Sequence, residues 1–323
     1  MLKFTIKRIL VAIPVLLGVT LLVFTMLYFT EGDPARLILG DTATEEEVEA
    51  LREELGLNDS FGQQYISYLG GVLKGDLGVD YITGRPVSEE VMDRLTTTLK
   101  LAVASIVFSM IVAIPAGIIS AVRQYSAVDN IAMVIALLGN SMPNFWLALM
   151  LILFFSVFLG ILPASGLYGA QYYIMPVIGI SAGSIATITR MTRSSMLEVI
   201  RQDYIRTSMA KGLTEFLIIV KHALKNALIP VITVIGIQFT VAVGGAVVNE
   251  QVFAIPGLGK FLVDAIKARN YQVVQGGVLV IAIICSIVNL VIDLLYAFVD
   301  PRIKSQYQKS GKIKRIRMVK EEG

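Results

Sequence analysis

Long apolar blocks without charge alternate along the chain with short polar stretches in which the charges gather. A helix rises ~1.5 Å per residue, so about 20 apolar residues are needed to cross a ~30 Å hydrocarbon layer. The pattern therefore predicts an all-α integral membrane protein. The blocks that reach this length are Ile9–Phe29, Leu101–Val122, Ile131–Leu162, Ala227–Val248 and Val273–Val299.

Two regions modify this simple count. The block that begins at Ile131 is longer than one crossing and contains Gly139 and Pro143, which predicts a kink or a break near the proline. A weaker apolar segment, Ile174–Ile188, is diluted by glycines, serines and Pro176. We interpret this segment as a further span, because the placement of charge requires one.

Basic residues decide the number and the direction of the spans. Lys7 and Arg8 precede the first block, and the segment after Val299 is rich in lysine and arginine. The positive-inside rule then places both termini in the cytoplasm, which requires an even number of crossings and hence six. The first block exceeds a signal-peptide core of about 7–15 residues, so we expect it to be retained. Residues 30–98 are then outside, and residues 190–226 are inside.

The outer loop begins with a helix signal. Thr44 and Glu47 have the spacing of a capping box, Val48 and Leu51 recur on one helical face, and Gly56 can end the helix. The pattern predicts a short amphipathic helix. Either it folds over the spans, or it forms a docking surface for an external partner, and the sequence favours neither.

The inner segment Asp203–Pro230 predicts two helices that meet at a sharp corner. We expect a helix over Tyr204–Lys211 with Asp203 as its cap, a left-handed Gly212, and a second helix capped by Thr214. One side should pack on the ends of the spans, and the other should face the cytosol. The expected packed side carries Ile205, Met209, Leu213, Phe216 and Val220, and the expected cytosolic side carries Thr207, Lys211, Glu215 and His222.

Three interpretations of this segment compete: a DNA-binding helix-turn-helix, a passive loop, and a contact that transmits force from a soluble motor. Its position between two membrane spans argues against the first, so we expect no nucleic-acid partner.

Composition excludes several other classes of protein. Only 16% of the 323 residues are charged and 55% are hydrophobic, whereas soluble domains carry about 25% charged residues. The single Cys285 and the single His222 can form neither a disulfide nor a metal cluster. The spans also lack the acids and histidines of a proton relay, and the chain lacks a clustered catalytic constellation. We therefore expect no catalytic residue and no metal site.

A glycine-rich string near Lys260 does not form an ATP-binding loop. Ala254 stands where the Walker A pattern has its first glycine, and Phe261 stands where it has serine or threonine. We expect instead a glycine turn that leads into a short helix.

The inner segment resembles the EAA loop of importer-type ABC permeases. Arg206-Thr207-Ser208 stands at the small-residue trio, Gly212 at the glycine, and His222-Ala223-Leu224 near the end. Arg206 replaces the usual glutamate and Lys225 the usual proline, as in the dipeptide/oligopeptide and nickel permease branch. Further motifs of that branch follow in order along nearly the whole chain: Gly32-Asp33-Pro34, Gly75-Asp76-Leu77-Gly78, Gly84-Arg85-Pro86-Val87, Phe145-Trp146-Leu147, Leu162-Pro163-Ala164-Ser165-Gly166, Pro256-Gly257-Leu258-Gly259 and Asp300-Pro301-Arg302.

This resemblance is to the first of two permease subunits, and it implies the six-helix type I ABC importer permease fold with an extracytoplasmic loop insertion after the first helix. The expected regions are an N-terminal helix (1–29), the outer loop (30–98), a permease core (99–303) that includes the coupling loop (190–226), and a basic tail (304–323). The implied location is the inner membrane of a bacterium or archaeon, with both termini in the cytoplasm.

The resemblance also implies partners. They are a second permease, two ATP-binding subunits that bind ATP and Mg, and an extracytoplasmic substrate-binding protein, so this chain should bind no cofactor of its own. The implied cargo is di- or oligopeptides, with nickel complexes or oligosaccharides as alternatives within the same machinery. A secondary carrier or a channel is the alternative class.

Two sets of site residues follow. The residues expected to couple the chain to the ATPases are Asp203, Tyr204, Arg206, Thr207, Ser208, Ala210, Lys211, Gly212, Leu213 and His222. Polar groups are costly within a membrane and often line a cavity, although amides also join helices to each other, so both roles stay open for the second set. The candidates for the translocation path are Asn140, Ser141, Asn144, Gln238, Asn249 and Glu250.

Overall fold

The computed structural model describes residues 2–30, 32–40 and 42–299, and helices dominate this part of the chain. Its only β pairing is an isolated bridge between Val79 and Pro86. The predicted basic tail (304–323) lies outside the described residues.

Within the described residues, six long segments have the length and composition of membrane spans if a bent helix pair counts as one. The five that pass as single helices are Thr5–Tyr28 of α1 (Leu2–Tyr28), α5 (Val87–Val122), α8 (Gln171–Ile200), the continuous stretch Glu215–Val252, and Tyr271–Leu295 of α13 (Tyr271–Val299). The sixth is a bent pair that joins α6 (Ala127–Ser141) to α7 (Asn144–Leu151) and the π-helix η1 (Ile152–Phe158). The prediction of an all-helical membrane protein is confirmed.

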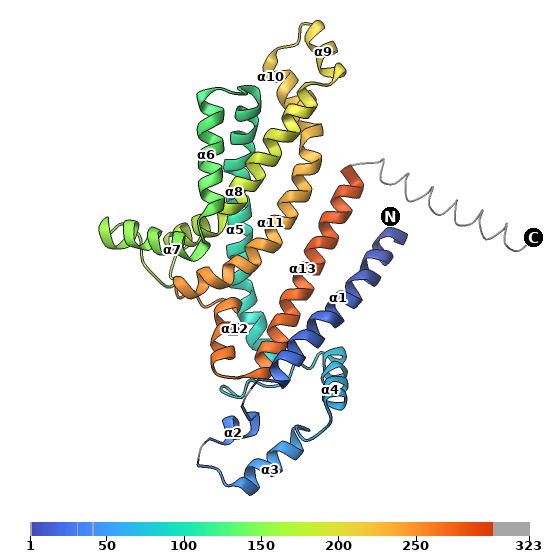
Figure 1. Ribbon diagram of the computed structural model, residues 1–323, viewed down its shortest axis with the longest axis vertical. Coiled ribbons are helices and arrows are strands. Elements are labelled where there is room, and N and C mark those ends of the chain that lie inside the picture. The colour runs from blue at the N-terminus through green and yellow to red at the C-terminus, as the bar shows by residue number, and fades with distance from the viewer. Residues whose placement is uncertain (1, 31, 41, 300–323) are drawn as a thin grey trace, which may run out of the picture.

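The bent pair confirms the predicted break near Pro143, which is the N-cap of α7. The two halves are bent by 103°, so α7 leaves the bundle sideways instead of continuing across it (Figure 1). A proline cannot supply the backbone N–H that a continuous helix needs at this point, which explains why the helix ends before it.

The interior of the bundle is formed by α5, α8 and α11 (Leu224–Val252), with α6 packed on α8. Small residues allow α5 and α8 to approach closely. Ser181 Oγ donates to the Ser105 backbone oxygen at 3.0 Å, and a Cβ on Gly117 would lie 2.6 Å from the Cβ of Thr192. Such small-residue contacts are typical of helix pairs in membranes, where close packing replaces the hydrophobic effect.

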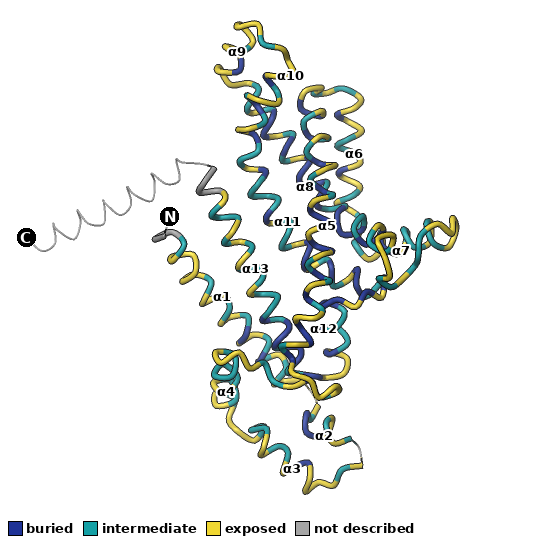
Figure 2. Tube along the Cα trace, turned by 180° about the vertical axis from the view of Figure 1, so that it is seen from behind, coloured by how far each residue is buried: buried dark blue, intermediate teal, exposed yellow. Residues whose placement is uncertain are grey.

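The helices α1 and α13 pack against each other beside this bundle and remain mostly exposed (Figures 1 and 2). Asp293 of α13 pairs with Arg8 of α1 at 2.8 Å. In a membrane, the exposed apolar faces of both helices contact lipid or another subunit.

Short helices occupy opposite ends of the molecule (Figure 1). One end carries α2 (Pro34–Leu39), α3 (Glu45–Glu54) and α4 (Phe61–Lys74), and the other carries α9 (Asp203–Ala210) and α10 (Glu215–Leu217). The capping box predicted for α3 is present: Thr44 Oγ1 accepts from the Glu47 backbone N–H, and Glu47 Oε2 accepts from the Thr44 N–H at 2.9 Å. Helix α5 begins at Val87, within the region predicted as loop.

Candidate functional site

The α9 helix, its glycine corner and α10 form an elbow, residues 203–217, at one end of the bundle. Gly212 has φ = +74°, in the left-handed region that residues with a side chain rarely adopt. A Cβ at this position would meet nothing within 4 Å, so the backbone angle, and not crowding, requires the glycine. The predicted helix–corner–helix geometry is confirmed.

The start of α9 differs from the prediction. Gln202 is the N-cap, and Asp203 is the first helical residue and contributes no cap. Thr214 is the N-cap of the second helix, as predicted, although its side chain makes no capping hydrogen bond. The second helix does not end after α10: it continues through the π-helix η2 (Ile218–Ala223) into α11, so the elbow is directly continuous with a span.

One buried side chain anchors the elbow. Ile205 is fully buried and belongs to an apolar cluster with Met196 of α8, Ile218 and Ala227. Asn226 Nδ2 also donates to the hydroxyl of Tyr204 at 2.8 Å. These contacts tie one face of α9 to the ends of α8 and α11.

The predicted packing is wrong for three of the other apolar residues and is confirmed for Leu213, which packs on the same cluster. Met209, Phe216 and Val220 are exposed by 51%, 75% and 45%, and only Leu213 of the remainder is partly buried. Because α10 runs straight on into α11, its first turn projects beyond the ends of the neighbouring helices and finds nothing to pack against. The elbow thus presents an apolar surface that is uncovered in this chain.

The polar residues of the elbow are also accessible. Thr207 Oγ1 and Ser208 Oγ donate to backbone oxygens one turn earlier, at 3.0 and 2.8 Å. Arg206 reaches Asp203 only at 4.0 Å, and Lys211 makes no ion pair within the described part of the chain. Ala210 is exposed and His222 is half-buried in η2. Exposed methionine and aromatic side chains beside unpaired basic groups are typical of a protein interface.

A buried ion pair close to the elbow was not predicted from the sequence. Asp129 of α6 is 1% exposed and accepts from Arg193 of α8 through Nε and Nη2, both at 2.7 Å. Ser120 and the backbone N–H of Tyr125 donate to the same carboxylate. The pair holds α6 against α8. The spacing of Ser126 and Asp129, which marks the start of α6, is the only local signal for it.

The six path candidates fall into two groups. Asn140 and Ser141 are exposed at the end of α6, and Asn144 is half-buried at the start of α7, beside Gly245. Gln238 of α11 accepts from Ser184 Oγ of α8 at 3.2 Å. Asn249 and Glu250 are fully buried at the far end of α11.

Glu250 joins three helices. Its carboxylate accepts from Thr98 Oγ1 of α5 at 2.6 Å and from the backbone N–H of Lys260 in α12 (Leu258–Lys267) at 2.9 Å. Thr98 Oγ1 in turn accepts from the Leu258 N–H at 2.9 Å. A Cβ on Gly257 would lie 2.2 Å from this carboxylate, so the glycine is required by space. The prediction that this glycine turn leads into a short helix is confirmed.

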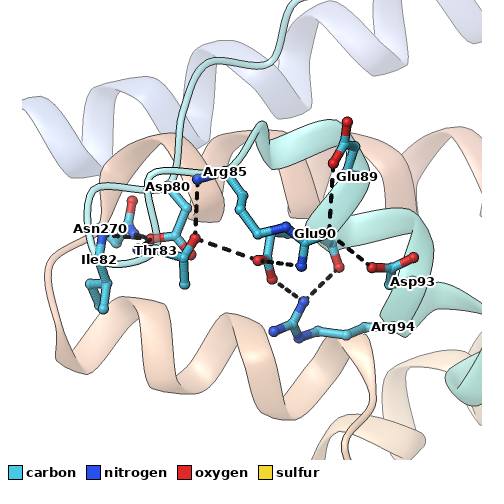
Figure 3. A network of polar contacts seen from close by, with 9 residues as sticks. All are labelled: Asp80, Ile82, Thr83, Arg85, Glu89, Glu90, Asp93, Arg94 and Asn270. Carbon is cyan, nitrogen blue, oxygen red and sulfur yellow. Dashed lines mark hydrogen bonds and ion pairs between the residues drawn. The ribbon is translucent and has the colours of Figure 1, made fainter.

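A second polar network fixes the turn before α5 (Figure 3). Glu90 is 1% exposed and accepts from Arg85 Nη1 at 3.0 Å and from Arg94, which also lies over the ring of Phe261 at 3.9 Å. Asp80 accepts from Asn270 Nδ2, between α12 and α13, at 2.6 Å. The turn, α5, α12 and α13 are therefore held together by paired groups.

A bundle of apolar helices with folded loop helices at one end and an exposed elbow at the other is the architecture of a multi-pass membrane protein. Two family models cover most of the chain: "Binding-protein-dependent transport system inner membrane component" matches residues 113–305, and "Binding-prot-dependent transport system membrane comp, N-term" matches residues 1–102. The chain belongs to this family and is an inner-membrane permease component of an ABC importer.

Curated relatives match along nearly their full length. The dipeptide transport system permease protein DppB of Alkalihalophilus pseudofirmus is 42% identical, over 94% of this chain and 100% of the relative. DppB and the glutathione transport system permease protein GsiC, both of Escherichia coli K12, are each 41% identical over 94% of this chain and 99% of theirs. An inward-facing structure of the MetNI methionine ABC transporter shares the fold, with a TM-score of 0.56 and 22% identity over 65% of this chain and 96% of that one.

Proposed function

We propose that the chain forms one half of the translocation path of an ATP-driven importer for di- and oligopeptides. The observation that supports this cargo is the similarity to two relatives. A dipeptide permease and a glutathione permease are equally similar to this chain, over 94% of its length. A path suited to short peptides is the property that the two relatives share.

The cargo test is uptake by the complete complex in proteoliposomes. Labelled dipeptides should accumulate when ATP is present on the elbow side, and unlabelled di- and tripeptides should compete with them. Competition by a nickel complex or an oligosaccharide, with none by peptides, would reject the peptide cargo while leaving the importer class unaffected.

The partners in this proposal are a second permease, two ATP-binding subunits and an external binding protein. The ATP-binding subunits hold ATP and Mg, and this chain supplies no ATPase site. The exposed apolar faces of α6 and α7 support the second permease, since residues such as Ile135, Leu138 and Trp146 are uncovered within this chain. Such faces require lipid or protein contacts in the membrane.

The elbow is the proposed contact with an ATP-binding subunit. Met209 and Phe216 would enter a groove on that subunit, while Arg206 and Lys211 would pair with acidic residues there. Closure of the ATPase pair would move the elbow as a unit, because Ile205 fixes α9 to the bundle and α10 is continuous with α11. The other residues that were predicted to couple the chain to the ATPases, including His222, are proposed to belong to the same contact.

The elbow end is proposed to be cytoplasmic, and the α2–α4 end extracytoplasmic. The α1 and α13 helices support this orientation. The N-terminal end of α1 and the C-terminal end of α13 both lie toward the elbow end of the molecule (Figure 1). The boundaries at residues 29, 98 and 303 remain part of this proposal, with 190–226 as the coupling loop.

The path is proposed to run beside the α6–α7 bend. Asn140, Ser141 and Asn144 would face it, since they are accessible or half-buried at the bend. Gln238 contacts α8 and would border the same space. Asn249 and Glu250 are buried, so they would stabilise the helices at the outer end of the path without lining it.

A further inference from the structure

A cavity of about 670 Å³ lies at the α2–α4 end, between the end of α1, helices α3 and α4, and the start of α13. This volume falls within the range of about 300–1,000 Å³ that small-molecule sites occupy. Neither the elbow nor any path candidate lines the cavity. The import mechanism proposed above therefore gives it no role.

Four tyrosines contribute to its wall: Tyr28, Tyr68, Tyr81 and Tyr271. Both hydroxyls are neutral at physiological pH, and burial raises the pKa of Tyr68 and of Tyr81 further, to about 12. Neutral tyrosine rings present an electron-rich face, which attracts cations within about 6 Å of the ring centre.

The charges of the cavity wall do not balance. Arg52 is its only basic residue, and Nε and Nη2 of its guanidinium donate to Asp33 at 3.1 and 2.8 Å, while Nη1 donates to Glu49 at 2.8 Å. Each of the three guanidinium nitrogens of this arginine thus donates to a carboxylate. Asp59 and Asp76 also line the cavity, and neither forms an ion pair with any residue that the structure describes.

We propose that this cavity binds a ligand through a primary ammonium group. The carboxylates of Asp59 and Asp76 would supply the opposite charge, and the tyrosine rings would contact the cation and its methylene groups. Gln64 and Ser67, also in the wall, provide oxygen acceptors for its N–H groups. A phosphate or a carboxylate would instead meet the like charges of Asp59 and Asp76.

The surroundings allow two sources of the ammonium group. Phe24 and Tyr28 of α1 pack with Phe61 and Tyr65 of α4 in an aromatic cluster beside the cavity. Aromatic clusters at the end of a span mark the depth of lipid headgroups, so an ethanolamine headgroup can reach the cavity. Because the cavity is also open to the loop side, a soluble amine or a basic peptide can enter.

The test uses the full chain, purified in the complex that it forms, in a maltoside detergent that carries no ammonium group. The probe is 1,5-diaminopentane, and its binding is followed by calorimetry or by saturation-transfer NMR. We expect saturable binding that weakens as salt is raised, because exposed charges are screened. Asp59→Asn and Asp76→Asn should each weaken binding about fivefold, the equivalent of one favourable partly exposed ion pair.

A matched control keeps this result specific. Glu46→Gln removes an exposed carboxylate from α3, which belongs to the same loop but does not line the cavity, and it should leave binding unchanged. Asp76→Asn preserves the side-chain oxygen that accepts from the Gly78 N–H at 2.8 Å, so folding should persist, and a thermal unfolding curve checks this.

Two further arms identify the source. Displacement of the diamine by phosphatidylethanolamine, but not by phosphatidylglycerol, would assign a lipid headgroup, and displacement by dilysine alone would assign a soluble ligand. Absence of diamine binding, or binding that both aspartate variants leave unchanged, would overturn the proposal. Since no transport is measured, this outcome is independent of the peptide cargo.

Discussion

At the elbow end, a single buried isoleucine and one tyrosine hydrogen bond hold α9 to the bundle. At the opposite end, buried carboxylates join α5, α11 and α12 through several paired groups. The elbow leaves Phe216 and Met209 uncovered, while Glu90 and Glu250 are almost completely buried. The polar groups at one end are paired within this chain, whereas the other end leaves an apolar surface that this chain does not cover. Substitutions at the two ends should therefore fail in different ways, through stability at one and through coupling at the other.

The largest effect should come from Glu250→Ala, which leaves Thr98 and the Lys260 N–H without their buried acceptor. Hydrogen bonds to a charged group contribute about 1.5–3 kcal/mol each, so we expect a loss of about 3 kcal/mol. Thermal unfolding of the detergent-solubilised chain measures it. Glu198→Ala, at an exposed position of α8, is the control and should change little. Equal stability of the two variants would remove the distinction between the ends.

Gly212→Glu should act on transport instead. A residue with a side chain disfavours φ = +74° by roughly 1–2 kcal/mol, so the corner should open and displace α9. We expect peptide uptake to fall about tenfold or more while ATP hydrolysis by the complex persists. Gly212→Asn is the matched control, because asparagine tolerates left-handed angles, and it should retain most uptake. Normal uptake by Gly212→Glu would contradict the proposal that the elbow couples ATP hydrolysis to transport.

Phe216→Ser should affect transport more than stability. The ring is 75% exposed, so its removal should change stability by less than about 0.5 kcal/mol. Uptake should nevertheless fall several-fold, because the ring is proposed to be buried against the ATPase. Tyr168→Ser removes an aromatic ring that is 88% exposed elsewhere and should leave uptake intact. If both variants transported equally, the exposed ring of the elbow would have no partner.

The smallest effect is a pH dependence at α12. The hydrogen bond from Lys260 lowers the pKa of Asp264 below its ordinary value. A carboxyl group with a depressed folded-state pKa stabilises the protein above its ordinary pKa, and this contribution is lost as the pH falls through the folded-state value. Because the pair is partly exposed, it should contribute no more than about 0.5 kcal/mol. Unfolding midpoints between pH 6 and pH 3, at intervals of about 0.5, should show a shallower acid decline for Lys260→Gln.

Local signals in the sequence predicted local structure well. Pro143, the Thr44–Glu47 capping box and Gly212 each act within a few residues, and each lies where expected. The 103° bend was not predictable, because it depends on how α7 packs against α8 and α11.

Contacts between segments that are distant in the sequence were not predictable from local patterns. Asp129 and Arg193 are 64 positions apart, so no periodicity within one segment could connect them. The exposure of Met209 and Phe216 was missed because helical periodicity indicates which residues share a face, but does not show whether a neighbouring helix covers that face.

The most direct test of the elbow as a cytoplasmic, ATPase-covered contact is labelling of Met209→Cys in a Cys285→Ala background with a membrane-impermeant maleimide. The account predicts no reaction in right-side-out vesicles, reaction in inside-out vesicles stripped of the ATP-binding subunits, and protection when those subunits are added back. Labelling from the outside, or labelling that the ATP-binding subunits do not reduce, would contradict it.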